Sequence, residues 1–155
     1  MKTISATLTV AFLALILAVH THAFQADPAG PEALDHWGRV KTSIDGYLGR
    51  PYVWGGCGLK SFDCSGFVWR VMFDNGMFFK RTTARKLYMS LPKSAPGEIW
   101  NSGNIVFFNN LKHCGIVCNR DSFYHAQTTV GTNLSLFDSF WQPKIVGFRR
   151  LPEKD

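Results

Sequence analysis

The chain has 155 residues, of which 46% are hydrophobic, 14% aromatic and 18% charged. This length suits one domain, and the hydrophobic content excludes an intrinsically disordered chain. The 17 basic and 11 acidic residues give a formal net charge of +6, which suits an anionic surface such as a cell wall or a membrane face. Nucleic acid is disfavoured as a partner because the basic residues are scattered and accompany no recognised binding motif.

The first 23 residues have the layout of a secretory signal peptide. Lys2 gives a positive start, an apolar run extends from about Leu8 to Val19, and Thr21-His22-Ala23 offers small residues around a cleavage site. The run is short for a membrane-spanning helix, and a retained N-terminal anchor is the alternative. A lipid anchor is disfavoured because the first cysteine is Cys57. We expect a secreted or periplasmic protein without a stable membrane anchor.

Residues 24–31 are rich in Pro, Gly and Ala and are interpreted as a leader before a domain at residues 32–155. The first helix is predicted from Glu32 to about Leu48. Its apolar residues recur in steps of three and four, the pattern of an amphipathic helix. They are Leu34, Trp37, Val40, Ile44 and Leu48. Gly49 and Pro51 then end the helix.

An aromatic and glycine-rich loop follows, from Tyr52 to Gly58. Its glycines allow backbone conformations that are closed to other residues. A phosphate-binding loop is the more specific interpretation of these glycines, but neither GxxxxGK[ST] nor GxGxxG is present. The phosphate-binding interpretation is therefore discarded.

Two more helices are predicted after this loop. Asp63 is a natural N-cap for the first of them, which is expected to end at Asn75 before Gly76. Its interior is apolar on nearly every side, so it should be buried. A short third helix is predicted from Thr82 to Ser90, before Pro92.

In the second half of the chain the spacing of apolar residues changes from that of helices to that of strands. Strands are predicted at residues 104–108, 114–118, 122–127 and 144–149, and a longer polar loop precedes the last of them. Helices followed by antiparallel strands indicate an α+β domain.

Four cysteines in an exported chain first suggest two disulfides. Cys114 and Cys118 fall on one predicted strand, about 13 Å apart at about 3.3 Å per residue, so they cannot bond to each other. The chain contains no CxxC pair, which argues against a structural zinc site. At least one cysteine is therefore expected to stay free.

Cys64 lies at the start of the predicted buried helix. A helix N-terminus carries unpaired N–H groups and partial positive charge, which lower the pKa of a thiol placed there. The same N–H groups can hold a developing oxyanion during acyl transfer. Residue type and position both favour a cysteine nucleophile.

A cysteine nucleophile also needs a base and a group that orients the base. His36 falls among polar positions of the first helix and is expected at the surface, whereas His113 and His125 fall on neighbouring predicted strands. If these strands pair, one imidazole can take the thiol proton while the other fixes its tautomer. The alternative is that the cysteine and the histidines are only structural.

Six segments resemble the NlpC/P60 family of cell-wall cysteine peptidases, in the family's order. They are residues 49–56 (GRPYVWGG), 62–68 (FDCSGFV), 81–83 (RTT), 103–108 (GNIVFF), 113–117 (HCGIV) and 124–126 (YHA). The resemblance extends from about Asp35 to Arg150. It implies a papain-like α+β core with N-terminal helices on a central antiparallel sheet, the catalytic cysteine on a helix and two histidines on the sheet.

The resemblance implies Cys64 as nucleophile, His113 as base and His125 as the orienting third residue. Tyr52 matches a tyrosine whose hydroxyl helps at the oxyanion hole. The implied reaction is cleavage of an amide bond in the peptidoglycan stem peptide, between D-γ-glutamate and a diamino acid, through an acyl-enzyme thioester. No metal or cofactor is implied.

The resemblance also suggests substrate-binding residues. Asp63 and Ser65 match positions that contact the substrate near its free amine. Trp54 is a further candidate, with burial in the core as its alternative. Gln127 falls on the same strand face as His125 and is held in reserve as the polar partner of the base.

The expected partners are stem peptides and an inhibitor or immunity protein, and the chain is expected to be a monomer. Two other functions stay open. One is a Cys-His acyltransferase or amidase that acts on a substrate outside the wall, because a fold does not fix its substrate. The other is a non-catalytic wall-binding module.

The chain departs from the family pattern at three points. Ser102-Gly103-Asn104-Ile105 replaces the common Pro-Gly-Asp-Leu, Cys114 replaces an aliphatic residue, and Cys57 enters the glycine loop. Disulfides from Cys57 to Cys114 or to Cys118 therefore stay open. A bond from Cys57 to Cys64 would silence the enzyme.

Overall fold

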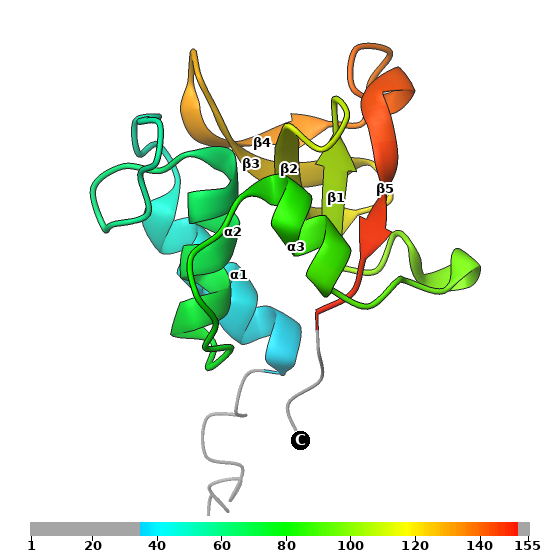
Figure 1. Cartoon of the computed structure of the whole chain (residues 1–155), viewed down its shortest axis with the longest axis horizontal. Coiled ribbons are helices and arrows are strands. Elements are labelled where there is room, and N and C mark those ends of the chain that lie inside the picture. Colours follow the sequence, from blue (N-terminus) through cyan, green and yellow to red (C-terminus); the bar gives the residue numbers. More distant parts are fainter. Residues whose placement is uncertain (1–34, 152–155) are drawn as a thin grey trace, which may run out of the picture. The chain divides into compact units, whose positions relative to one another are not determined.

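The structure, a computed structural model, describes residues 35–151. The predicted signal peptide, the leader and the start of the first predicted helix lie outside the described residues. Within them, three α-helices precede a five-stranded antiparallel sheet in the order β4-β3-β2-β1-β5 (Figure 1). The α+β prediction is thereby confirmed. No helix among residues 35–151 is long and apolar enough to cross a membrane.

Helix α1 (His36–Tyr47) has the amphipathic character that its sequence predicts. Val40 and Ile44, one turn apart, are both buried. The helix begins at His36 because Asp35 caps it, accepting a hydrogen bond from the backbone N of Gly38 at 2.6 Å. The helix ends at Tyr47, one residue before the predicted end.

Helix α2 (Cys64–Asp74) is the buried helix, and Asp63 is its N-cap as predicted. Helix α3 (Ala84–Ser90) begins two residues later than predicted because Thr83 caps it. Two short 3-10 helices, η1 (Pro96–Glu98) and η2 (Gln142–Lys144), lie in the connections of the second half.

Four strands match their predicted positions closely: β1 (Ile105–Phe108), β2 (His113–Asn119), β3 (Ser122–Gln127) and β5 (Ile145–Arg149). The fifth, β4 (Gly131–Leu136), lies in the segment predicted to be a polar loop, so that prediction was wrong. In this edge strand the apolar side chains face outward and the polar ones face inward. Leu134 and Leu136 are 48% and 62% exposed, whereas Ser135 and Asn133 are partly buried. An inward polar face conceals a strand from a search for inward apolar residues.

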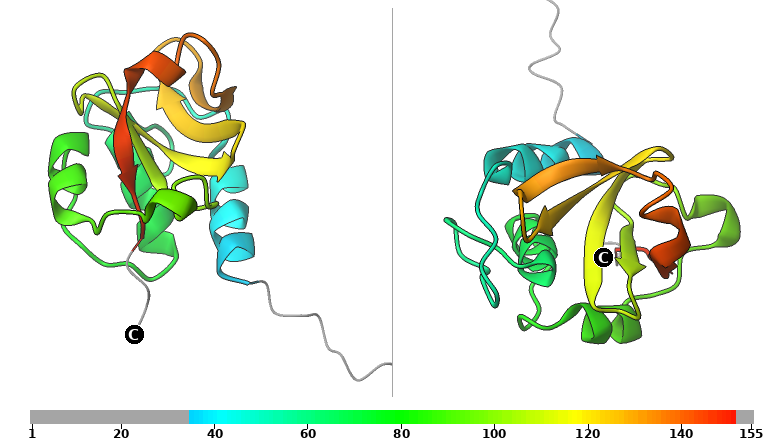
Figure 2. Two further views of the ribbon diagram at one scale, coloured as in Figure 1. Left: turned by 90° about the vertical axis from the view of Figure 1, so that its right-hand side faces the viewer. Right: turned by 90° about the horizontal axis from the view of Figure 1, so that it is seen from above.

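The sheet packs an apolar cluster against each face. On one face, α1, α2 and α3 cover side chains of the first three strands: Ile105, Phe107, Cys114, Ile116, Tyr124 and Ala126. On the other face, the segment between β4 and β5 supplies Phe137 and Trp141, which pack on Val106, Phe108, Val117 and Phe123. The strands twist and curve between these two layers (Figure 2). Each face is therefore a separate buried environment.

Candidate active site

Cys64 is the first residue of α2, and its side chain is buried against β2. The pKa of the Cys64 thiol is lowered to about 5. The largest cause is a hydrogen bond from the Cys114 thiol, which outweighs burial, and a hydrogen bond from His113 and its positive charge lower the pKa further. The Cys64 sulfur is therefore a thiolate at neutral pH, which is the nucleophilic form.

Cys114 is fully buried on β2, next to Cys64. Burial raises its pKa well above the ordinary value, and the hydrogen bond to Cys64 raises it further. Cys114 therefore stays protonated and can donate to the Cys64 thiolate. All four cysteines have free thiols in the structure, so none of the disulfides considered for Cys57 is formed.

The two histidines face each other across paired strands. Nε2 of His113, at the start of β2, lies 2.8 Å from Nδ1 of His125 on β3. Burial, and then the positive charge of His113, lower the pKa of His125 to about 3, against a hydrogen bond with Asn133 that raises it. His125 is therefore neutral at physiological pH.

Trp141 holds both imidazoles in place. Its ring stacks on His113 with centroids 5.4 Å apart and an interplanar angle of 23°. The same ring meets His125 edge-on at 5.0 Å and 85°. Sequence reasoning missed Trp141 because it lies in an irregular connection between β4 and β5.

Gly115 explains how the two histidines come so close. The register of β2 and β3, with Ile116 opposite Tyr124, sets Gly115 across from His125. A Cβ atom on Gly115 would lie 2.6 Å from the Tyr124 carbonyl oxygen and 2.8 Å from the Phe123 ring. Because glycine has no side chain, β3 can approach and bring His125 to His113.

Tyr52 lies near the nucleophile and is partly buried. Burial raises the pKa of its hydroxyl most, and the negative charge of Cys64 raises it next. The phenol therefore stays protonated beside the thiolate, as an oxyanion donor must. Trp54, two residues further along the same loop, is 86% exposed, which excludes the core position considered for it.

Asp63 joins the parts of the site that carry Cys64. Its carboxylate accepts from the backbone N of Gly66 at 2.6 Å, from the backbone N of Gly55 at 2.9 Å and from Ser65 Oγ at 3.1 Å. Arg81 Nη2 lies 2.6 Å from both carboxylate oxygens. These bonds tie the glycine loop, the start of α2 and the segment before α3 together. Substrate contact by Asp63 and Ser65 stays a prediction.

The glycine loop also packs directly on the first turn of α2. The backbone N of Asp63 donates to the Gly56 carbonyl oxygen at 2.9 Å. A Cβ atom on Gly66 would lie only 1.9 Å from that oxygen. The glycine after Cys64 therefore has a packing role.

The remaining histidine and the reserve residue lie outside the Cys64–His113–His125 arrangement. His36 is exposed on α1, as predicted. Gln127 ends β3 opposite Gly131 of β4, while His125 occupies the position beside His113. Among residues 35–151 no group of three or more His, Cys, Asp or Glu side chains is arranged to hold a metal ion.

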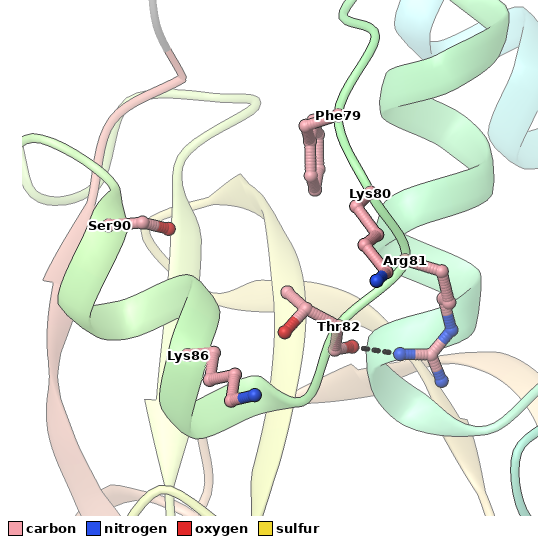
Figure 3. A pocket seen from close by; sticks show the side chains of 6 residues that line it. All are labelled: Phe79, Lys80, Arg81, Thr82, Lys86 and Ser90. Carbon is pink, nitrogen blue, oxygen red and sulfur yellow. Dashed lines mark hydrogen bonds between the residues drawn. The ribbon is translucent and has the colours of Figure 1, made fainter.

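A basic pocket of about 350 Å³ lies between α3 and the segment before it (Figure 3). It is lined by Phe79, Lys80, Arg81, Thr82, Lys86 and Ser90. The Arg81 guanidinium turns toward α2, where it binds Asp63. The pocket is therefore linked to the residue before Cys64, and its two lysines, Lys80 and Lys86, suit an anionic group.

Comparisons with known proteins identify the family of the chain. The model of the NlpC/P60 family matches residues 49–150. The chain is 36% identical to the probable peptidoglycan endopeptidase LytE of Bacillus subtilis over 116 residues, which are 72% of this chain and 34% of that protein. It is 26% identical over 112 residues to the gamma-D-glutamyl-L-lysine dipeptidyl-peptidase of Bacillus subtilis, covering 67% of this chain and 37% of that enzyme.

A solved structure is similar over most of the chain. It is an NLP/P60 family protein from Staphylococcus aureus, described as similar to lipoprotein, with a TM-score of 0.68 and 27% identity. The match covers 83% of this chain and 45% of that chain. This chain thus spans about a third of the two Bacillus proteins and less than half of the Staphylococcus protein.

Proposed function

This chain belongs to the NlpC/P60 family, and we propose that it is a cysteine hydrolase that cleaves an amide bond in the peptidoglycan stem peptide. One observation carries the proposal: a Cys64 thiol of pKa about 5 lies beside a His113–His125 pair joined at 2.8 Å. The names of the Bacillus relatives support both the substrate and the D-γ-glutamyl–diamino acid bond.

In the first step, the Cys64 thiolate attacks the carbonyl carbon of the scissile amide. The carbonyl oxygen becomes an oxyanion, and the Tyr52 hydroxyl and the N–H groups at the start of α2 donate to it. Because the charge moves from sulfur to this oxygen, donors around the oxygen lower the barrier.

His113 completes acylation as a general acid. It gives its proton to the nitrogen of the departing diamino acid, the C–N bond breaks and a thioester to Cys64 remains. His113, now neutral, takes a proton from a water molecule, and the resulting hydroxide attacks the thioester. The new carboxylic acid leaves, and the Cys64 thiolate and protonated His113 are restored. No metal or cofactor takes part in this proposal.

Recognition is assigned to the exposed rim of the site and to two buried polar residues behind it. On the rim, the side chain of Trp54 offers an apolar face to the substrate. The buried Asp63 and Ser65 are assigned to the free amine of the substrate. The basic pocket suits a carboxylate of the stem peptide, because Lys80 and Lys86 line it. Stem peptides carry both amine and carboxylate groups, so the two kinds of subsite are complementary to one ligand.

Catalysis is assigned to residues 32–155, acting outside the cytoplasmic membrane after removal of residues 1–23. The apolar run between Leu8 and Val19 supports this export. We propose a monomer that an inhibitor or immunity protein controls. N-terminal sequencing of the exported protein tests the cleavage site, and light scattering of the purified protein tests the oligomeric state.

The test of function is a digest of purified peptidoglycan by residues 24–155, beside the Cys64→Ala variant, with products identified by mass spectrometry. The expected result is new fragments from the parent alone, whose masses identify the cleaved bond. An intact wall treated with a parent whose Cys64 is reduced and reactive would favour acyl transfer on another substrate. Wall binding by both proteins without cleavage would favour a binding module.

A further inference from the structure

Strand β4 contributes an unexpected polar pair to the catalytic site. Asn133 pairs with His125 in the β3–β4 register, and Ser135 Oγ lies 2.9 Å from His125 Nε2. Asn133 Oδ1 accepts from Ser135 Oγ at 3.1 Å, and its Nδ2 donates to the Gly131 carbonyl oxygen at 2.8 Å. A continuous chain of hydrogen bonds therefore runs from the backbone of β4 to His113.

The direction of every bond in this chain follows from its first member. A backbone carbonyl only accepts, so the Asn133 amide group must turn its NH₂ to Gly131 and its oxygen to Ser135. The Ser135 hydroxyl proton is then committed to Asn133, which leaves a lone pair of Ser135 Oγ for His125. Nε2 of His125 must carry the proton that completes this contact.

The proton on Nε2 of His125 determines what the base can do. A neutral imidazole with its proton on Nε2 has an acceptor at Nδ1, and this atom faces Nε2 of His113 at 2.8 Å. His113 must then donate from Nε2, so its Nδ1 is the nitrogen that can take the Cys64 proton. In the opposite tautomer, His125 would donate to Nε2 of neutral His113, whose Nδ1 would already hold a proton. That form cannot act as the base.

We propose that Ser135 and Asn133 are positioning residues that hold His125 in its Nε2–H tautomer and so keep Nδ1 of His113 available to Cys64. The inference rests on the proposed cysteine hydrolase function and extends its Cys-His-His set by two residues. Neither residue touches the thiol, so both act only through the histidines.

The experiment combines imidazole spectroscopy with kinetics. Long-range ¹H–¹⁵N correlation spectra of ¹⁵N-histidine protein at pH 7 report which nitrogen of His125 is protonated. Hydrolysis of a stem peptide gives kcat and KM. The variants are Ser135→Ala, Ser135→Thr, which keeps the hydroxyl, and Asn133→Ala. The control is Leu136→Ala, an exposed neighbour on β4.

We expect the Nε2–H pattern for His125 in the parent, in Ser135→Thr and in Leu136→Ala. Ser135→Ala should give the other tautomer or a mixture, with kcat about 10- to 100-fold lower and KM unchanged, because a buried donor loses its acceptor. Asn133→Ala should give a smaller loss, since Ser135 is then free to donate or accept.

If the spectrum of the unmutated protein shows the His125 proton on Nδ1, the proposal is overturned, whatever the variants show. A Ser135→Ala protein with the spectrum and kcat of Leu136→Ala would overturn it too. If the parent cleaves no stem peptide, the hydrolase proposal fails, while the spectra still decide the tautomer. The two failures are therefore distinguishable.

Discussion

The candidate active site has two parts, around Cys64 and around His125, and in each part a different cause dominates the pKa. Around Cys64, polar partners prevail over burial and lower the thiol pKa to about 5, so an anion is stable in a buried position. Around His125, burial prevails and lowers the imidazole pKa to about 3, so a cation is excluded. The N–H groups at the start of α2, the Cys114 thiol and the His113 imidazole surround Cys64, whereas aromatic rings pack around His125.

This difference shows why the site needs two histidines with unlike surroundings. Two charged imidazoles 2.8 Å apart would repel each other. Burial keeps the His125 imidazole neutral, so the pair never holds two positive charges at neutral pH. We therefore expect changes in the part around Cys64 to act on packing and thiol pKa, and changes in the rim to act on binding alone.

The largest effect is expected from Gly66→Ala, which breaks the contact between the glycine loop and α2. The added Cβ would lie 1.9 Å from the Gly56 carbonyl oxygen, so the loop must move. We expect a loss of at least about 3 kcal/mol in the free energy of unfolding, with loss of hydrolysis. Denaturant unfolding measures the first quantity.

The control is Gly46→Ala in α1, where an added Cβ meets no atom within 4 Å. That variant should raise stability by up to about 1 kcal/mol, because alanine favours a helix. Equal stability of the two variants would contradict the packing role of Gly66.

The next effect concerns the Asp63–Arg81 ion pair. The side chains are only 11% and 23% exposed, and Asp63→Asn keeps the helix cap but removes the charge. We expect the free energy of unfolding to fall by about 2 kcal/mol, because Arg81 is left without its counter-charge. Thermal unfolding provides the measurement.

The matched surface pair is Lys41–Asp45, whose side chains are 36% and 48% exposed. Lys41→Gln should change stability by less than about 0.5 kcal/mol. If Asp63→Asn and Lys41→Gln lower the free energy of unfolding equally, the Asp63–Arg81 pair has no special structural role.

A smaller effect is expected from Cys114→Val, which removes the largest cause of the low Cys64 pKa while filling the same space. An acid that loses a donor to its ionised form has a higher pKa, so the thiolate should appear at higher pH than in the parent. Alkylation of Cys64 at pH 6 should therefore slow, with little change above pH 9. Cys118→Val, on the same strand, is the control and should leave the alkylation midpoint unchanged.

The smallest structural effect is expected from Trp54→Ala, on the exposed rim. Stability should change by less than about 0.5 kcal/mol, because the side chain is 86% exposed. We expect KM for a stem peptide to rise while kcat holds, with Leu136→Ala as control. An unchanged KM would remove Trp54 from the substrate-binding residues.

How far the sequence predicts the molecule depends on how local each signal is. The cap at Asp63, the buried helix after it and the strands beginning near His113 and Ser122 are encoded by neighbouring residues. These elements were predicted with small errors at their ends. Because Cys64 and the two histidines fall on them, the three residues could be selected before the structure was known.

The parts that escaped prediction depend on distant partners. In β4, Leu134 and Leu136 face outward while Ser135 faces His125, so the strand is recognisable only when the buried imidazole is known. Trp141 stacks on His113 from an irregular connection. An aromatic residue in an ordinary surface loop would have the same local sequence, so the sequence alone does not reveal this contact.

The central claim is that Cys64 is a thiolate at neutral pH. It is tested most directly by the rate of Cys64 alkylation by iodoacetamide between pH 3.5 and 9, measured by peptide mass spectrometry to separate it from the other three free cysteines. Because an acid is ionised above its pKa, the account predicts a rate that falls as pH drops through about 5 and is nearly constant above pH 7. A midpoint near about 8.5, the value of an ordinary thiol, would contradict it.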